Sequence, residues 1–171
     1  LLERLGLELH YEGPEHSIYS LADAQELERG VLNLLSNAAK FSPGGSVIRC
    51  SLTRQSRILR LCIQDEGSGI PDDVRGSVFN RYLRQPAIED GRQGLGLGLV
   101  LVRACAGHHG GAVLIDHPAQ GGTRVTVTLA IRQDTGNTLR SPRIRIDYAG
   151  ERDHALVELS DVLPAELYGS L

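Results

Sequence analysis

The chain has 171 residues, of which 41% are hydrophobic and 4% aromatic, and it contains neither Trp nor Met. This length suits one domain, or one domain with an appendage, and it is enough to bury a real hydrophobic core. A formal net charge of −3 argues against a large basic surface for nucleic acid. No apolar run approaches the roughly 20 residues of a membrane span, and no signal peptide opens the chain. We therefore expect a cytoplasmic domain, whether or not its parent protein is anchored in a membrane.

Three cysteines, Cys50, Cys62 and Cys105, lie in apolar segments and form no C-x-x-C pair. An odd number of cysteines without that spacing predicts buried free thiols in a reducing compartment. The opening residues Leu1-Leu2-Glu3-Arg4 look like the middle of a chain, so we expect a domain cut from a longer protein.

The first expected elements are two strands and a long helix. Residues 7–11 alternate apolar and polar side chains, which predicts a strand, and residues 17–21 predict a second, short strand. Asp23 offers a helix N-cap with Glu26 at the capping-box spacing, and the helix then runs to Phe41. An apolar stripe at helical spacing predicts its buried face: Leu27, Val31, Leu34, Leu35 and Ala38.

A polar stripe lies opposite that apolar face. At about 100° per residue, Asn33, Asn37 and Lys40 fall close together, with Glu26 and Arg29 nearby. A solvated helix face is the ordinary interpretation of such a stripe. However, Asn is a weak helix former, so two asparagines one turn apart indicate a role other than helix propensity.

Two alternating segments, around Ile48 to Leu52 and Leu59 to Ile63, predict a β-hairpin that turns over residues 54–57. The second strand leads directly into Asp65-x-Gly67-x-Gly69. An acid at the end of an apolar strand, followed by spaced glycines, places a carboxylate at the lip of a sheet with room for a flat ligand. A plain turn uses the same residue types, and both interpretations remain open at this point.

Residues 72–93 are irregular and carry four arginines, which are Arg75, Arg81, Arg84 and Arg92. A stretch of this length with few apolar anchors favours a functional lid over a passive connection. The motif Gly94-x-Gly96-x-Gly98-Leu99 follows and leads into an apolar helix. Glycines at a helix start favour an anion such as phosphate, although a bland glycine-rich turn is the alternative. The spacing matches neither the P-loop nor the dinucleotide fingerprint.

The rest of the chain predicts strands over residues 112–115 and 125–131, with Gly121-Gly122-Thr123 leading into the second. From residue 132 the composition turns polar, which predicts a domain boundary. We therefore divide the chain into a domain of residues 1–131 and an extension of residues 132–171. For the extension we expect a β-hairpin on the sheet edge and a short helix; a docking surface for another domain is the alternative.

Four spaced motifs, taken together, resemble the ATP-binding catalytic domain of sensor histidine kinases, in the superfamily shared with gyrase, MutL and the heat-shock chaperones. They match the N, G1, F and G2 boxes: Asn33 to Lys40, Asp65-x-Gly67-x-Gly69, Val78-Phe79 and Gly94-x-Gly96-x-Gly98. His109-Gly110-Gly111 and Gly121-Gly122-Thr123 are similar to the closing signatures, and the F box is the loosest match. The resemblance runs from Leu1 to Ile131 and implies an α/β (α+β) fold, a two-layer Bergerat-type sandwich with helices on one face of a mixed β-sheet.

The resemblance also implies a function and its residues. Asn37 is expected to ligate Mg²⁺, Lys40 to meet phosphate, and Asp65 to accept a hydrogen bond from the adenine amino group of ATP. The catalytic set is Asn33, Asn37 and Lys40. The remaining residues expected to contact the nucleotide are Gly67, Gly69, Arg84, Arg92, Gly94, Gly96, Gly98, Leu99 and Thr123.

The expected reaction is transfer of the γ-phosphoryl of Mg·ATP to a histidine on a separate dimerisation domain, with a response regulator downstream. None of the six histidines here has the family's acceptor context, and we expect His109 to be structural. A stand-alone serine kinase of the anti-sigma-factor type, an ATP-operated clamp like MutL or gyrase, and a degenerate binding module are the alternatives. In the ATP-hydrolysing clamps a Glu occupies the position of Asn33, and an amide cannot act as a base toward water.

Overall fold

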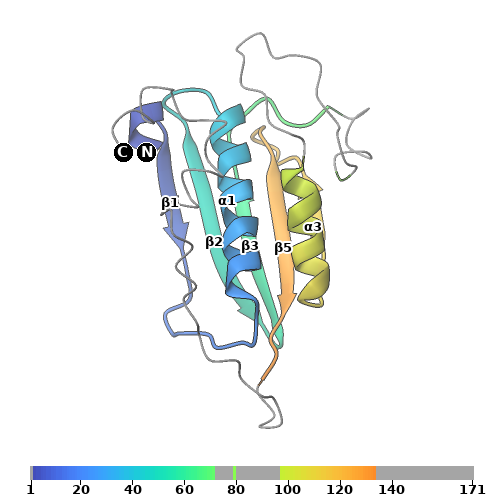
Figure 1. The fold of residues 1–171 in the computed structure, drawn as a ribbon. Coiled ribbons are helices and arrows are strands. Elements are labelled where there is room, and N and C mark those ends of the chain that lie inside the picture. Colours follow the sequence, from blue (N-terminus) through green and yellow to red (C-terminus); the bar gives the residue numbers. More distant parts are fainter. Residues whose placement is uncertain (1, 72–78, 80–96, 134–171) are drawn as a thin grey trace, which may run out of the picture.

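The computed structural model describes residues 2–71, 79 and 97–133 of the chain (Figure 1). The expected lid over residues 72–93 therefore lies outside the described residues, except for Phe79. Gly94, Gly96 and the expected hairpin and helix of the C-terminal extension also lie outside them.

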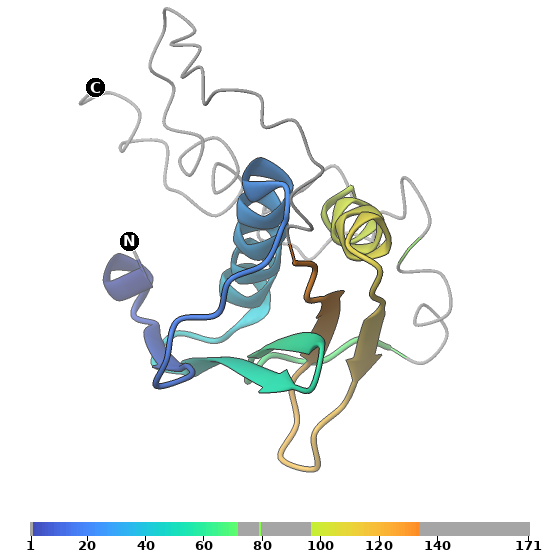
Figure 2. The ribbon, with the colours of Figure 1, turned by 90° about the horizontal axis from the view of Figure 1, so that it is seen from below.

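A mixed five-stranded sheet forms one layer of the molecule, in the order β1-β2-β3-β5-β4. The strands are β1 (Glu8–Glu12), β2 (Val47–Gln55), β3 (Ile58–Gln64), β4 (Val113–Asp116) and β5 (Arg124–Ala130). β1 pairs with β2 in parallel, and the other neighbours are antiparallel. The helices α1 (Ala24–Phe41) and α3 (Gly98–His108) cover one face of this sheet, and a short 3₁₀ helix, η1 (Leu2–Leu5), precedes β1 (Figure 2). This confirms the expected two-layer sandwich.

The alternation of side chains along the strands decides which face the helices cover. Ile48 and Cys50 are two positions apart on β2, so both side chains lie on the same face, and both are buried. Cys50 pairs with Ile63 of β3, which is buried on that face too. The opposite face is largely polar, although Ile58 and Leu114 are exposed on it. It carries two exposed ion pairs, Arg49–Glu66 and Arg124–Asp116, each with a contact of 2.7 Å. The β2–β3 hairpin turns over two residues, 56 and 57, so its strands extend further than the expected four-residue turn allowed.

Small residues on α1 let the helices pack closely on the sheet. Gly30, Ser36, Ala38 and Ala39 are buried along α1 together with Leu34. The core that forms between helices and sheet comprises Leu7, Leu34, Ala38, Ala39, Ile48, Cys50, Ile63, Val102, Ala106 and Val127. Its burial is the main force that holds the two layers together.

The ends of α1 follow the local rules of helix capping. The Asp23 side chain accepts hydrogen bonds from the backbone N–H groups of Gln25 and Glu26, at 2.9 and 3.0 Å. Ser42 ends the helix, and its hydroxyl donates to the carbonyl oxygen of Ala38 at 2.6 Å. The helix thus has the predicted start and end.

The predicted short strand over residues 17–21 is wrong. The segment bonds to the chain after β5 only at single points: the Leu21 N–H donates to the Arg132 carbonyl, and the Arg132 N–H donates to the Ser20 hydroxyl. Two isolated bonds do not make a ladder, so this segment is not a strand.

All three cysteines are free, and Cys50 and Cys105 are buried as expected. Cys62 is only half-buried, because it lies on the face of β3 that neither α1 nor α3 covers. Among the described helices, none is long and apolar enough to cross a membrane.

Candidate functional site

Four segments far apart in the sequence meet at one end of the sheet. The two helices run in opposite directions, so α1 ends at the same edge at which α3 begins (Figure 1). β3 also ends there, and the turn before β5 lies beside it. This end of the sheet therefore brings together most of the described residues of the N, G1 and G2 boxes and of the Gly121-Gly122-Thr123 signature.

Asp65 is the buried acid at this end of the sheet, with 7% of its surface exposed. One carboxylate oxygen, Oδ1, accepts hydrogen bonds from the backbone N–H groups of Gly67 (2.9 Å) and Thr123 (3.0 Å). Burial raises the pKa of Asp65, while those two N–H groups and the nearby His117 act in the opposite direction. Within the described part of the chain, no donor bonds the second oxygen, Oδ2. Asp65 thus has one oxygen fixed by the backbone and one without a donor from those residues.

Glycines around Asp65 allow a close approach of backbone. A Cβ at Gly67 would overlap the carbonyl oxygen of Phe41, the last residue of α1, so only glycine fits between the helix end and Asp65. Gly122, with φ of +80°, lies against the carbonyl of Asp65 itself. The tight contacts therefore hold the G1 loop against α1 on one side and against the turn before β5 on the other.

The polar stripe of α1 is half-buried rather than fully solvated: Asn33, Asn37 and Lys40 all have intermediate exposure. Asn33 donates from Nδ2 to the carbonyl oxygen of Arg29 at 2.8 Å. Lys40 places its ammonium 5.6 Å from the centre of the Phe41 ring. No other described residue bonds the side-chain amide of Asn37. Among the described residues, nothing occupies the hydrogen-bonding atoms of this amide.

The start of α3 faces this stripe. A Cβ at Gly98 would lie 2.7 Å from Asn33 Oδ1, so the glycine motif and the N box are in direct contact. Leu97 occupies the N-cap position without a side-chain cap, and Leu99 is half-buried in the first turn. The backbone N–H groups of this turn are not used by a capping side chain. Such a helix start can meet an anion.

Other predicted site residues are only partly described. Phe79 of the F box packs its ring against the guanidinium of Arg103 on α3, with 5.6 Å to the ring centre. Arg84, Arg92, Gly94 and Gly96 lie outside the described residues. Thr123 is buried and meets Asp65 through its backbone rather than its hydroxyl.

A role for His117 was not predicted from the sequence; this residue follows β4 and bonds both the G1 loop and the turn at residues 121–122. No spacing pointed to it, because its partners lie elsewhere in the chain. Only the register of β4 against β5 brings this histidine to the edge of the sheet.

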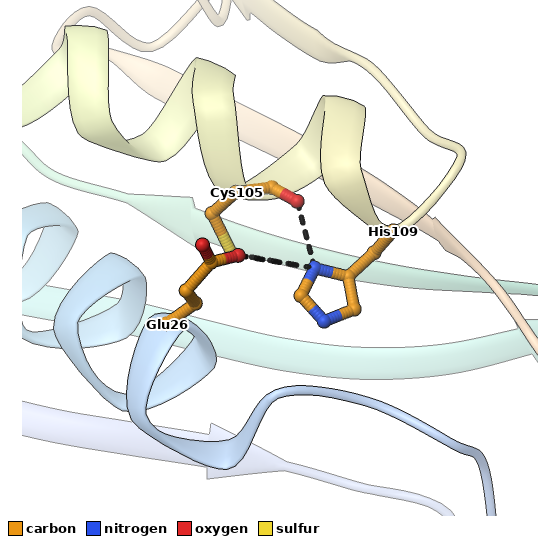
Figure 3. A group of neighbouring side chains, drawn as sticks. All are labelled: Glu26, Cys105 and His109. Atoms are coloured by element: carbon orange, nitrogen blue, oxygen red, sulfur yellow. Dashed lines mark hydrogen bonds and ion pairs between the residues drawn. The ribbon is translucent and has the colours of Figure 1, made fainter.

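A second cluster of potential ligands lies at the opposite ends of the two helices. Ligand atoms of Glu26, Cys105 and His109 lie within 4.8 Å of one another (Figure 3). His109 Nδ1 lies 2.8 Å from the Cys105 carbonyl oxygen, which can only accept, so Nδ1 carries the ring proton. His109 Nε2 accepts from the backbone N–H of Asp23 at 3.0 Å. A metal bound to Nδ1 would force the ring proton onto Nε2. The Nε2–H group would then face the backbone N–H of Asp23, and two hydrogen-bond donors would oppose each other.

The Cys105 thiol also argues against a metal site. Burial raises the pKa of Cys105, and the negative charges of Glu26 and Asp23 raise it further, so the thiolate that a metal requires is disfavoured. We therefore assign the cluster to helix packing. Buried His109 joins the end of α3 to the N-cap of α1, which supports its expected structural role, and the exposed His108 adds a hydrogen bond to Glu26 at 3.0 Å.

Comparisons with known proteins agree with this geometry. Residues 22–133 match the family described as histidine kinase-, DNA gyrase B-, and HSP90-like ATPase. Sensor histidine kinase TmoS of Ectopseudomonas mendocina is 35% identical over 140 residues, which are 80% of this chain and 14% of that protein. Signal transduction histidine-protein kinase/phosphatase MprB of Mycolicibacterium smegmatis is 43% identical over 101 residues, 58% of this chain and 20% of that protein. The chain thus spans only a small part of these relatives.

Solved structures show the same fold. A mycobacterial sensor histidine kinase MprB aligns with a TM-score of 0.66 at 34% identity, covering 77% of this chain and 87% of that chain. The catalytic domain of histidine kinase ThkA aligns with a TM-score of 0.68 at 17% identity, which shows the likeness of fold alone. The identification drawn from the four boxes is confirmed at the level of the family: the chain is similar to the ATP-binding catalytic domains of sensor histidine kinases, and it belongs to the family of histidine kinase-, DNA gyrase B- and HSP90-like ATPases.

Proposed function

We propose that this domain binds Mg·ATP at the edge where α1, α3 and the G1 loop meet, and passes the γ-phosphoryl to a histidine on a separate dimerisation domain. A response regulator then receives the phosphoryl group. The observation that carries this proposal is Asp65, whose Oδ1 is fixed by two backbone N–H groups and whose Oδ2 bonds no donor of the described residues.

Asp65 is suited to read an adenine base. An acceptor held rigidly in a buried site favours a ligand that presents an N–H donor, because an opposed acceptor would leave both groups unsatisfied. Adenine carries an amino group where guanine carries a carbonyl, so this carboxylate favours ATP over GTP. Gly67 and Gly69 are proposed to lie beside the base; the Phe41 carbonyl oxygen and the His117 ring already fill the space of their missing side chains, so the G1 loop is held tightly next to Asp65.

The phosphates would lie between the second half of α1 and the start of α3. Asn37 offers an amide oxygen to Mg²⁺, which takes one or two protein oxygens beside phosphate and water. Lys40 offers a point charge, and the uncapped first turn of α3 offers backbone N–H groups. Mg²⁺, when bound, neutralises phosphate charge and orients the terminal phosphoryl group. Arg84, Arg92, Gly94 and Gly96 are proposed to complete the site from the segment outside the described residues.

The kinase is favoured over the ATP-operated clamp by Asn33. Its side chain donates to Arg29 and faces Gly98, and as an amide it cannot take a proton from water near neutral pH. An imidazole acceptor brings its own lone pair, so transfer to histidine depends on positioning and charge stabilisation rather than on a base. The names of the relatives favour histidine over the serine acceptor of the anti-sigma-factor kinases.

Calorimetric titration of the chain with ATP and GTP, with and without Mg²⁺, tests the proposal. We expect ATP to bind more tightly than GTP, and Mg²⁺ to strengthen ATP binding. Asn37→Ala should remove the gain from Mg²⁺, whereas Gln25→Ala, an exposed amide on the first turn of the same helix, should leave it unchanged. Equal binding of ATP and GTP, or an undiminished Mg²⁺ effect in Asn37→Ala, would contradict the proposal.

A further inference from the structure

His117 lies between the two segments that hold Asp65. Its ring follows the end of β4 and is half-buried. Nδ1 bonds the carbonyl oxygen of Gly122, in the turn that leads to Thr123. Nε2 lies 2.8 Å from the carbonyl oxygen of Ile70 and 3.2 Å from its backbone N. The ring therefore contacts the turn before β5 with one nitrogen and the end of the G1 loop with the other.

This connection holds in either protonation state of the ring. In the neutral form with the proton on Nδ1, the ring donates to Gly122 and accepts from the Ile70 N–H. In the imidazolium form both nitrogens donate, to the carbonyl oxygens of Gly122 and Ile70. A side chain with a single hydrogen-bonding atom could not join both segments. The connection between the two segments therefore depends on both ring nitrogens of His117.

The surrounding backbone is shaped for this ring. A Cβ at Gly69 would overlap the ring carbon Cε1 of His117, and Gly69 has a φ of +80°. Any L-residue at this position would both strain the backbone and displace the ring. The missing side chain of Gly69 thus makes room for the histidine ring.

The two segments joined by the ring also carry the donors to Asp65. Gly67 N–H belongs to the G1 loop that ends at Ile70, and Thr123 N–H follows Gly122 directly. A shift of either segment would release one of the two bonds that orient the carboxylate. We propose that His117 is a positioning residue of the nucleotide site, which sets the direction of Asp65 Oδ2 and hence the preference for adenine. This inference rests on the proposed role of Asp65 in base recognition.

The test measures, by calorimetry, how tightly ADP and GDP bind to the wild-type chain and to three variants. His117→Phe keeps a ring against Gly69 but removes both nitrogens, and His117→Asn keeps one donor within reach of Gly122. His10→Phe is the matched control, because His10 lies on β1 at the far edge of the sheet and bonds only Glu8 among the described residues.

We expect His117→Phe to weaken ADP binding by about tenfold, which corresponds to about 1.4 kcal/mol, and GDP binding by less than about twofold. The preference for ADP should therefore fall, with His117→Asn intermediate and His10→Phe unchanged. If His117→Phe does not fold, His117→Asn supplies the same comparison. Unchanged ADP affinity in folded variants, or an equal loss for ADP and GDP, would overturn the inference. If the unchanged chain does not prefer ADP to GDP, the proposed function fails and this inference with it.

Discussion

Replacing Asp65 with Asn changes the acceptor Oδ2 into an NH₂ group while leaving an Oδ1 that can keep its bonds to Gly67 and Thr123. The unliganded fold should therefore survive. Because burial raises the pKa of Asp65, the charged carboxylate carries a desolvation cost that the amide does not. We expect the melting temperature without nucleotide to stay the same or rise slightly.

The same substitution should weaken nucleotide binding, although it does not destabilise the unliganded fold. A hydrogen bond to a charged group is worth about 1.5–3 kcal/mol, so its loss raises the Kd for ADP by about 10- to 150-fold. At an ADP concentration of 100 times the original Kd, the unchanged chain gains about 2.7 kcal/mol, or about 5–11 °C. If the Kd rises about 100-fold, the same concentration yields only about 0.4 kcal/mol and a shift of about 1–2 °C.

Thermal unfolding with and without ADP measures both effects at once. Asp116→Asn is the control, since Asp116 is an exposed acid on the polar face, paired with Arg124. It should show the full ADP-induced shift. A full shift in Asp65→Asn would refute the assignment of this carboxylate to adenine.

Three further predictions concern the same framework. Gly122→Ala should destabilise the fold by more than about 2 kcal/mol in chemical denaturation, because its φ is +80° and the added Cβ overlaps the Asp65 carbonyl, whereas Gly44→Ala, in open space, should change little. His109→Ala should cost about 2–4 kcal/mol, from a cavity and a lost bond at the start of α1, against less than about 1 kcal/mol for the exposed His108→Ala. ADP affinity should fall as the pH drops through the raised pKa of Asp65, because below it the unliganded site holds a proton that the adenine amino group must displace; an affinity independent of pH in that range would contradict this.

Local signals in the sequence were sufficient for much of the fold. Asp23 predicted the start of α1 because an N-cap depends on residues two and three positions away. Asp65 was found at the end of an apolar strand because strand alternation is also a local pattern. The spaced glycines were predicted to let a ligand approach the backbone, which stays a prediction; Gly67 and Gly98 lie in close contact with Phe41 and Asn33 of α1.

The rest depended on contacts between distant segments. The capping-box spacing at Glu26 implied that its side chain would bond the N-cap backbone, but His109, 86 residues from Asp23, takes that N–H instead. Glu26 pairs with His108. His117 lies 47 residues from Ile70, so its role follows only from the assembled sheet. The strand predicted over residues 17–21 did not form because none of the described strands pairs with this segment.

The most direct test of the account is phosphoryl transfer in trans. The chain is mixed with γ-labelled Mg·ATP and the histidine-bearing hairpin of the parent kinase, and label on each chain is followed together with free phosphate. We expect acid-labile phosphate on the hairpin, none on this chain, almost no phosphate release without the hairpin, and loss of transfer in Asn37→Ala. Brisk phosphate release by the chain alone, at the rate of a dedicated ATPase, would contradict the kinase account and favour an ATP-operated clamp.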